Sequence, residues 1–159
     1  MLEGVEVPEG MNKEVLEHMI SPHNYGKLDD ANGVGVAVDE KTGEYTIMYL
    51  KIDDNLNITD IRYATNGCQD TVVVGSMFSD MIKKQNTEYA QKAIKKLYEK
   101  LGSNMTEKQR VCADMVFTSF IASLKNFENL KNGKTEEAHI LKMKESCETQ
   151  EGEENEWAL

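Results

Sequence analysis

The chain has 159 residues, of which 40% are hydrophobic and 29% charged, and its formal net charge is −10. This length predicts one domain with a sizeable core, while the lack of any apolar run near 18 residues argues against a membrane protein. No basic stripe with interleaved aromatic residues occurs, which argues against nucleic-acid binding.

The N-terminal part of the chain predicts a short helix followed by three strands. Apolar residues recur at helical spacing over residues 12–20, and Ser21-Pro22 ends that helix. Alternation of apolar and polar side chains then predicts strands at residues 34–38, 45–52 and 58–65. The alternation is clearest in the second strand, where one face holds Thr46, Met48, Leu50 and Ile52 and the other holds Tyr45, Ile47 and Tyr49.

The remainder reads as helical. Apolar residues at helical spacing predict helices over residues 70–84, 87–101, 106–127 and 135–144. The segment from Thr106 to Gln109 fits a capping box, which sets the start of the third of these helices. The expected core face of that helix includes Met115, Phe120, Ile121 and Leu124.

This order of elements predicts an α+β fold, with a small antiparallel three-stranded sheet covered on one face by about five helices. We expect a single domain over residues 1–145. Six glutamates follow Lys144 with no basic residue among them, so residues 146–159 are predicted to form an acidic, disordered tail.

Two of the three cysteines lie in local patterns that suit thiolate chemistry. Cys68 follows a glycine at an expected strand-to-helix corner, where the free N–H groups of a helix start favour the thiolate. Cys112 lies 44 residues later on an amphipathic helix, beside the unfavourable charge of Asp114. Cys147 is expected to be an incidental exposed thiol. An odd number of cysteines predicts free thiols in a reducing compartment, so we expect a cytoplasmic protein.

Simple packing competes with chemistry as an explanation for these side chains, since a free cysteine often fills a core as a small hydrophobic residue. His18, His23 and His139 show no metal-ligand spacing with one another or with a cysteine, so each is expected to be structural or solvated. No catalytic Ser/His/Asp order, phosphate loop or dinucleotide glycine pattern is visible, so we expect no enzyme.

With these residues placed, the chain resembles the iron–sulfur cluster scaffold family of IscU and the N-terminal domain of NifU over roughly residues 12–130. Three segments carry the resemblance: residues 21–26 after the first helix, 66–68 at the strand-to-helix corner, and 111–114 on the later helix. Their order and spacing, and the layout of strands followed by helices, agree with the family.

The resemblance implies a degenerate set of ligands. Family members hold a [2Fe–2S] cluster with three cysteines, helped by an aspartate and a histidine. Cys68 and Cys112 match two of the cysteines, Thr42 stands at the third, Glu44 at the aspartate and Val111 at the histidine. The implied cluster or metal ligands are therefore Cys68, Cys112 and Glu44, fewer than the four ligands that Fe–S clusters and Zn²⁺ usually take.

Three functions follow from this resemblance. The first is a scaffold or carrier for iron or a [2Fe–2S] cluster, with zinc as a variant, in which a second chain, an exogenous thiol or Cys147 completes the ligand set. The second is a cluster-free adaptor or regulatory module of the same pathway, and the third is a sulfur carrier with a persulfide on Cys68.

The resemblance also implies partners, namely a cysteine desulfurase and apo-protein acceptors. A DnaK-type chaperone is not carried over, because residues 105–109 contain no proline where the family has a proline-rich segment.

Overall fold

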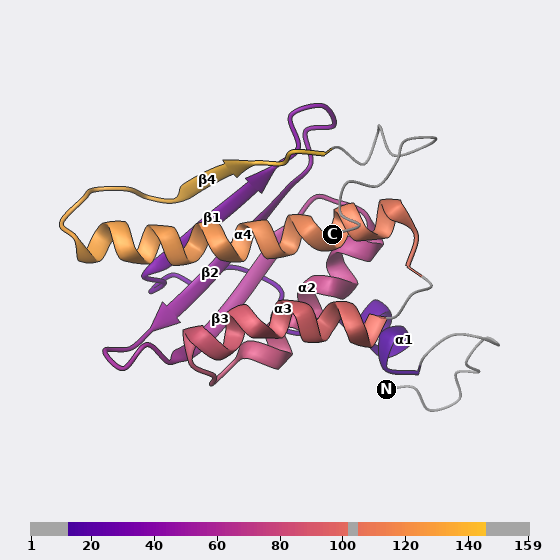
Figure 1. The fold of residues 1–159 in the computed structure, drawn as a ribbon, viewed down its shortest axis with the longest axis horizontal. Helices are drawn as coiled ribbons and strands as arrows, with labels where there is room; N and C mark the ends of the chain where they lie inside the picture. Colours follow the sequence, from indigo (N-terminus) through magenta and orange to yellow (C-terminus); the bar gives the residue numbers. More distant parts are fainter. Residues whose placement is uncertain (1–12, 102–104, 146–159) are drawn as a thin grey trace.

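The structure is a computed structural model that describes residues 13–101 and 105–145 (Figure 1). Within this part of the chain, helices and strands follow one another as α1 (Lys13–Ile20), β1 (Gly33–Val38), β2 (Tyr45–Ile52), β3 (Ile58–Thr65), α2 (Gln69–Ile82), α3 (Thr87–Leu101), α4 (Glu107–Lys131) and β4 (His139–Lys142). No helix among the described residues is both long and apolar enough to cross a membrane.

The strands form one sheet in the order β3-β2-β1-β4. The predicted strands pair antiparallel, as expected, with Val36 opposite Ile47 and Met48 opposite Tyr63. β4 adds to the free edge of β1 in parallel, with Ile140 opposite Val36. The α+β class is therefore confirmed, but the sheet is mixed and four-stranded rather than antiparallel and three-stranded.

The helix predicted over residues 135–144 is wrong, so the described residues hold four helices rather than five. The segment His139–Lys142 is a strand whose side chains alternate between half-buried and exposed, and Ile140 is 61% exposed. Its mixed polarity marks no helical face, and pairing with the edge of β1 decides its conformation. This outcome illustrates how tertiary context overrides weak local propensity.

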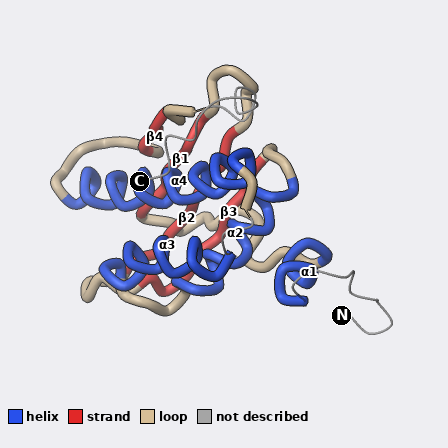
Figure 2. The backbone as a smooth tube through the Cα atoms, turned by 45° about the vertical axis from the view of Figure 1, so that its right-hand side comes forward, coloured by secondary structure: helices blue, strands red, loops and turns tan. Residues whose placement is uncertain are grey.

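One face of the sheet carries the core, and the helices cover that face (Figures 1 and 2). The alternation predicted for the second strand is confirmed, and the structure assigns Thr46, Met48, Leu50 and Ile52 to the core face, where they are nearly or fully buried. Across from the strands, the ring of Phe78 on α2 meets Phe117 and Phe120 on α4 edge-on, at centroid distances of 5.1 and 5.2 Å. These contacts join the two helices that carry the cysteines.

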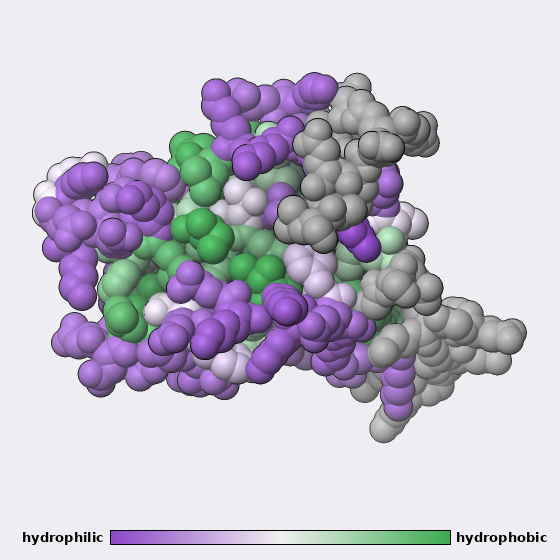
Figure 3. Space-filling model, in the orientation of Figure 1, coloured by the Kyte–Doolittle hydropathy of each residue, from purple (hydrophilic) through white to green (hydrophobic). Residues whose placement is uncertain are grey.

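Helix α4 begins where the sequence predicts. Thr106 caps it, with its hydroxyl accepting from the Gln109 N–H at 3.1 Å and the Gln109 side chain accepting from the Thr106 N–H at 2.9 Å. The expected burial of Ile121 is wrong, since it is 42% exposed and shares an outward stripe with the exposed Lys125 and Glu128. Figure 3 shows hydrophobic surface over the middle of α4 and between α4 and α3.

Two glycines let α4 approach the sheet closely. A Cβ added at Gly35 of β1 would lie 2.1 Å from the Ser123 nitrogen and 2.3 Å from the Ser119 carbonyl oxygen, and one at Gly33 would lie 2.8 Å from the Ser123 carbonyl oxygen. These neighbours are backbone atoms of a helix, which cannot rotate aside. Any side chain at Gly35 therefore pushes α4 off the sheet.

We expect Gly35→Ala to lower the free energy of unfolding by about 3 kcal/mol, the upper end of the usual cost of overpacking. Urea unfolding followed by circular dichroism measures this change. Val36→Ala, on the opposite face of the same strand, is the matched control and should cost at most about 1 kcal/mol. Equal stabilities of the two variants would contradict the close packing of α4.

A buried polar link fastens β4 to α4 and β1. The side chain of Asn126, fully buried, accepts from the Val34 N–H at 2.8 Å and donates to Glu136 Oε1 at 3.0 Å. Asn129 donates to the same oxygen at 3.2 Å, and His139 Nδ1 lies 3.1 Å from Glu136 Oε2. The hydrogen bond from Asn126, with those from His139 and Asn129, lowers the pKa of Glu136 from 4.5 to about 2.

This lowered pKa predicts a pH-dependent attachment of β4. The Glu136 carboxylate is the form that accepts these bonds, so its stabilisation is complete above pH 4.5 and is lost as the pH falls toward about 2. The protection of β4 amides against hydrogen exchange, relative to an unstructured chain at the same pH, should fall over that interval. In Glu136→Gln, this protection should already be lower at neutral pH and should not fall further over the interval. Glu137→Gln, at the exposed neighbour, should behave like the parent.

The predicted domain boundary at residue 145 remains a prediction. The predicted acidic tail over residues 146–159, with Cys147, lies outside the described residues.

Candidate functional site

Cys68 occupies the strand-to-helix corner that the sequence predicts, as the N-cap residue of α2. Its carbonyl oxygen accepts from the N–H groups of Thr71 and Val72 at 3.0 and 3.3 Å, which fixes the first turn. Its side chain makes no capping bond, so the sulfur is left to face the neighbouring helix. The thiol is half-buried.

Cys112 reaches the same place from the second turn of α4. The residue is fully buried, and its sulfur lies 3.1 Å from the sulfur of Cys68. The starts of the two helices are also linked by the Gln109 side chain, which donates to Asp70 Oδ1 at 3.4 Å. The structure therefore brings together the two cysteines that the sequence singled out.

The environment of Cys68 favours the thiol over the thiolate. A hydrogen bond with Cys112 and then burial raise the pKa of the Cys68 thiol above its ordinary value, outweighing the lowering effect of Thr71. The low pKa expected for Cys68 from its helix-start position is therefore wrong. Sulfur–sulfur contact and desolvation override the helix dipole here, and neither could be read from the local sequence.

The turn before β2 lies beside this corner because Asn66 ties the two together. The Asn66 side chain accepts from the Tyr45 N–H at 2.7 Å and donates to the Gly43 carbonyl oxygen at 3.2 Å. This turn carries Thr42, which is exposed, and Glu44, which is half-buried. This positioning role of Asn66 could not be predicted from the local sequence.

Glu44 brings an unsatisfied polar atom to the corner. Its Oε2 is buried and has no hydrogen-bond partner among the described residues. A Cβ added at Gly67, next to Cys68, would lie 3.1 Å from that oxygen. A buried carboxylate oxygen without a donor is costly, and a bound cation would satisfy it. The oxygen and the two sulfurs are not all within 4.8 Å of one another, so a cation shared by the three would require a side-chain movement.

The spacing of the sulfurs suits a metal after a small opening. Metal–sulfur bonds of about 2.3 Å in a tetrahedral site place two sulfurs about 3.8 Å apart. The observed 3.1 Å is shorter, so the pair would have to open by several tenths of an ångström as its protons leave. Val111, by contrast, is fully buried and apolar, and offers no ligand atom.

Comparison with known proteins shows the family to which the chain belongs. The family description "NifU-like N terminal domain" matches residues 11–135. The "Iron-sulfur cluster assembly scaffold protein IscU" of Aquifex aeolicus is 32% identical over 147 residues, which are 91% of this chain and 90% of that protein.

The chain belongs to the NifU-like N-terminal domain family.

Two further comparisons extend this result. The "Iron-sulfur cluster assembly scaffold protein IscU 1" of Archaeoglobus fulgidus is 27% identical over 138 residues, covering 87% of this chain and 89% of that protein. The crystal structure of a NifU-like N-terminal protein from Brucella abortus superposes with a TM-score of 0.58 at 17% identity, over 74% of this chain and 94% of that one. The latter supports the NifU-like fold.

A second group of side chains in this NifU-like domain has metal-binding chemistry, and sequence reasoning missed it. Within the described ranges, one ligand atom each from His18, His23 and Asp80 lie within 4.8 Å of one another. Burial, and then the nearby His23, lower the pKa of His18. The spacing of the two histidines across the end of α1 gave no metal signal, and Asp80 is remote in sequence.

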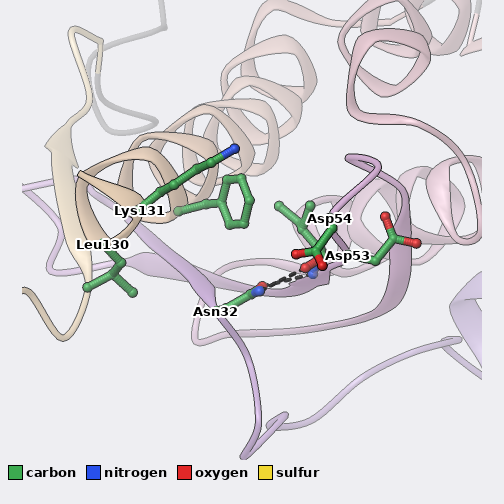
Figure 4. A pocket seen from close by; sticks show the side chains of 7 residues that line it. Asn32, Asp53, Asp54, Leu130 and Lys131 are labelled. Carbon is green, nitrogen blue, oxygen red and sulfur yellow. Dashed lines mark hydrogen bonds between the residues drawn. The ribbon is translucent and has the colours of Figure 1, made fainter. Parts of the chain in front are cut away.

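A hollow at the other end of the domain is unrelated to the cysteines (Figure 4). It measures about 280 Å³ and lies between Asn32, the loop after β2 and the end of α4 near Leu130. Leu130 is about 27 Å along α4 from Cys112. The Asn32 side chain in this hollow is bonded to the N–H and carbonyl of Ile52 at 2.8 Å each, so its polar atoms serve the fold.

Removing Cys112 should lower the pKa of Cys68, because the sulfur–sulfur hydrogen bond is the largest cause of its rise. In a Cys147→Ser parent, Cys112→Ala should shift the pH midpoint of Cys68 alkylation to lower pH. Thr71→Val is a control that should shift the midpoint in the opposite direction. The Thr71 hydroxyl lowers the pKa of Cys68, so its removal should raise that pKa. An unchanged midpoint in Cys112→Ala would contradict the coupling of the two thiols.

Proposed function

We propose that this chain is an IscU-like iron–sulfur cluster assembly scaffold or carrier, which takes up iron or a [2Fe–2S] cluster as cargo through Cys68, Cys112 and Glu44. The observation that carries the proposal is the convergence of two cysteines from separate helices, with sulfurs 3.1 Å apart, beside a buried carboxylate oxygen that has no partner among the described residues. The names of the relatives from Aquifex aeolicus and Archaeoglobus fulgidus support the same role.

Binding of the cargo has a simple proton balance. Each thiol that becomes a ligand releases its proton, because the thiolate is the form that binds metal. The raised pKa of Cys68 means that this residue stays a thiol until a metal arrives. Glu44 adds a carboxylate oxygen as a ligand. Iron bound at Cys68 thus displaces a proton from its sulfur.

The short ligand set suits transfer better than permanent storage. Iron–sulfur clusters are usually held by four thiolates, whereas the described part of this chain offers two sulfurs and one carboxylate at the site. The remaining positions would be filled by an exogenous thiol, a second chain or Cys147, and the first two can leave with the cargo. We accordingly place this protein between a cysteine desulfurase and apo-protein acceptors, as a carrier rather than an enzyme.

A cluster-free adaptor of the same pathway is the second candidate. The observation that favours it is the loss of ligand chemistry at Thr42, which is exposed in the turn, and at Val111, which is buried in the core. Under this alternative the cysteine pair and Glu44 are remnants of a metal site, and the fold alone serves partner binding.

Restoring a cysteine at position 42 tests the proposal directly. We expect the parent chain, reconstituted anaerobically with iron and sulfide, to acquire visible cluster absorbance that a chelator removes readily. Thr42→Cys adds a fourth ligand beside the pair and should slow this loss severalfold, while Thr135→Cys, at an exposed threonine beyond α4, should not. Cys68→Ser should abolish the absorbance.

Iron and sulfide analysis of the same samples decides between the two candidates. A colourless parent protein without bound iron would reject the carrier hypothesis and favour the adaptor hypothesis. The adaptor hypothesis predicts that partner binding survives in the double variant Cys68→Ser and Cys112→Ser.

A further inference from the structure

A second polar cluster joins α1 to the C-terminal half of α2, away from the cysteines. His18 lies on the last turn of α1, His23 follows in the loop after Pro22, and Asp80 extends from α2. Asp80 is twelve residues along the chain from Cys68, or about 18 Å along the helix. In Figure 1, α1 lies at the edge of the molecule beside α2. A ligand at this cluster cannot be shared with the cysteine pair.

Ser76, which is fully buried, organises the two histidines. Its hydroxyl oxygen lies 2.5 Å from His18 Nδ1 and accepts from the backbone N–H of His23 at 2.7 Å. The two imidazole rings are thereby stacked obliquely, with centroids 4.7 Å apart and an interplanar angle of 56°. Bonds of this kind to one ring nitrogen are what orient a histidine whose other nitrogen binds a metal.

Two contacts orient the Asp80 carboxylate. Its Oδ2 lies 2.5 Å from His23 Nδ1, and its Oδ1 accepts from the Asn24 side chain at 3.0 Å. Both carboxylate oxygens are therefore engaged, one by the histidine and one by the neighbouring amide. Asn24 adopts a positive φ of 60°, a conformation that Asn tolerates better than most residues, and this places its side chain over α2.

We propose that His18, His23 and Asp80 form a binding site for a divalent first-row transition metal ion, separate from the cysteine pair. One ligand atom from each of the three residues lies within 4.8 Å of the other two. A tetrahedral ion bound to imidazole nitrogen and carboxylate oxygen needs these atoms about 3.4 Å apart, which small side-chain rotations can reach. Two histidines and one carboxylate are a ligand set that suits Zn²⁺ or Fe²⁺.

The exposure and charge of the site agree with ion entry from solvent. His18 is 4% exposed and forms the inner wall, whereas the side chains of His23 and Asp80 are 36% and 42% exposed. Water can therefore complete the coordination on the open side. Glu14 and Glu17 of α1 add negative charge near His18.

A nearby cation, the ammonium group of Lys83, already interacts with other residues. The ammonium group of Lys83 contacts Asn24 Oδ1 at 3.5 Å and is paired with Asp60 at 3.6 Å. An ion bound to His23 Nδ1 replaces the contact of that nitrogen with Asp80 Oδ2, and the neutral imidazole then carries its ring hydrogen on Nε2, with no net release of a proton. Without an ion, the same hydrogen bonds simply fasten α1 to α2.

The test uses the full chain with Cys68, Cys112 and Cys147 replaced by serine, so that any failure of the proposed cluster function does not affect it. We expect this protein, after chelator treatment, to bind one equivalent of Zn²⁺ by calorimetry. Fe²⁺ under anaerobic conditions should compete, and Co²⁺ should give a spectrum without thiolate charge transfer. His23→Gln and Asp80→Asn should each weaken Zn²⁺ binding at least tenfold, with circular dichroism confirming the fold.

The chain offers a matched control. His139 also pairs with a carboxylate, that of Glu136 at 3.1 Å, but lacks a second histidine, so His139→Gln should leave the affinity unchanged. In the cysteine-to-serine protein that keeps all three histidines, Zn²⁺ should shift the imidazole NMR signals of His18 and His23 but not those of His139. Absence of stoichiometric binding, unchanged affinity in both His23→Gln and Asp80→Asn, or signals that move equally for all three histidines would overturn the proposal.

Discussion

The close packing of α4 on the sheet is the constraint on which the rest of this structure depends. Gly35 has no side chain, and the backbone of α4 at Ser119 and Ser123 fills the space that a Cβ would occupy. The helix is thereby held at a fixed height over β1, and its aromatic residues meet Phe78 of α2. Because α4 is a rigid rod, this contact near its middle also sets where its first turns, and hence Cys112, come to lie.

The cysteine pair follows from that constraint together with the corner at Cys68. One thiol is placed by a strand-to-helix turn and the other by a long helix, so neither depends on the conformation of a free loop. Asn66 then draws the turn of Glu44 to the same corner. Sites supported by regular elements are held more precisely than sites on loops, so the fold itself sets the separation of the two sulfurs.

The two polar clusters of the domain differ in what organises them. At the cysteines, contact with Cys112 and burial raise the pKa of the Cys68 thiol. At His18 and His23, a buried serine hydroxyl orients both residues, and one side of the cluster is open to solvent. α2 contributes to both clusters, through its N-cap residue Cys68 and through Ser76 and Asp80 further along the helix, and so holds them at a constant separation.

The sequence by itself determined the α+β class, the three antiparallel strands β1 to β3 and the cap of α4. These features depend on the periodicity and capping residues of each segment alone. It also singled out Cys68 and Cys112, first through their local patterns and then through the resemblance to IscU and NifU. The tertiary structure decided that residues 139–142 form an edge strand, that Ile121 faces outward and that the Cys68 thiol resists ionisation. Each of these outcomes, like the meeting of His18 with Asp80, depends on which distant segment packs beside the residue, and no local pattern encodes that contact.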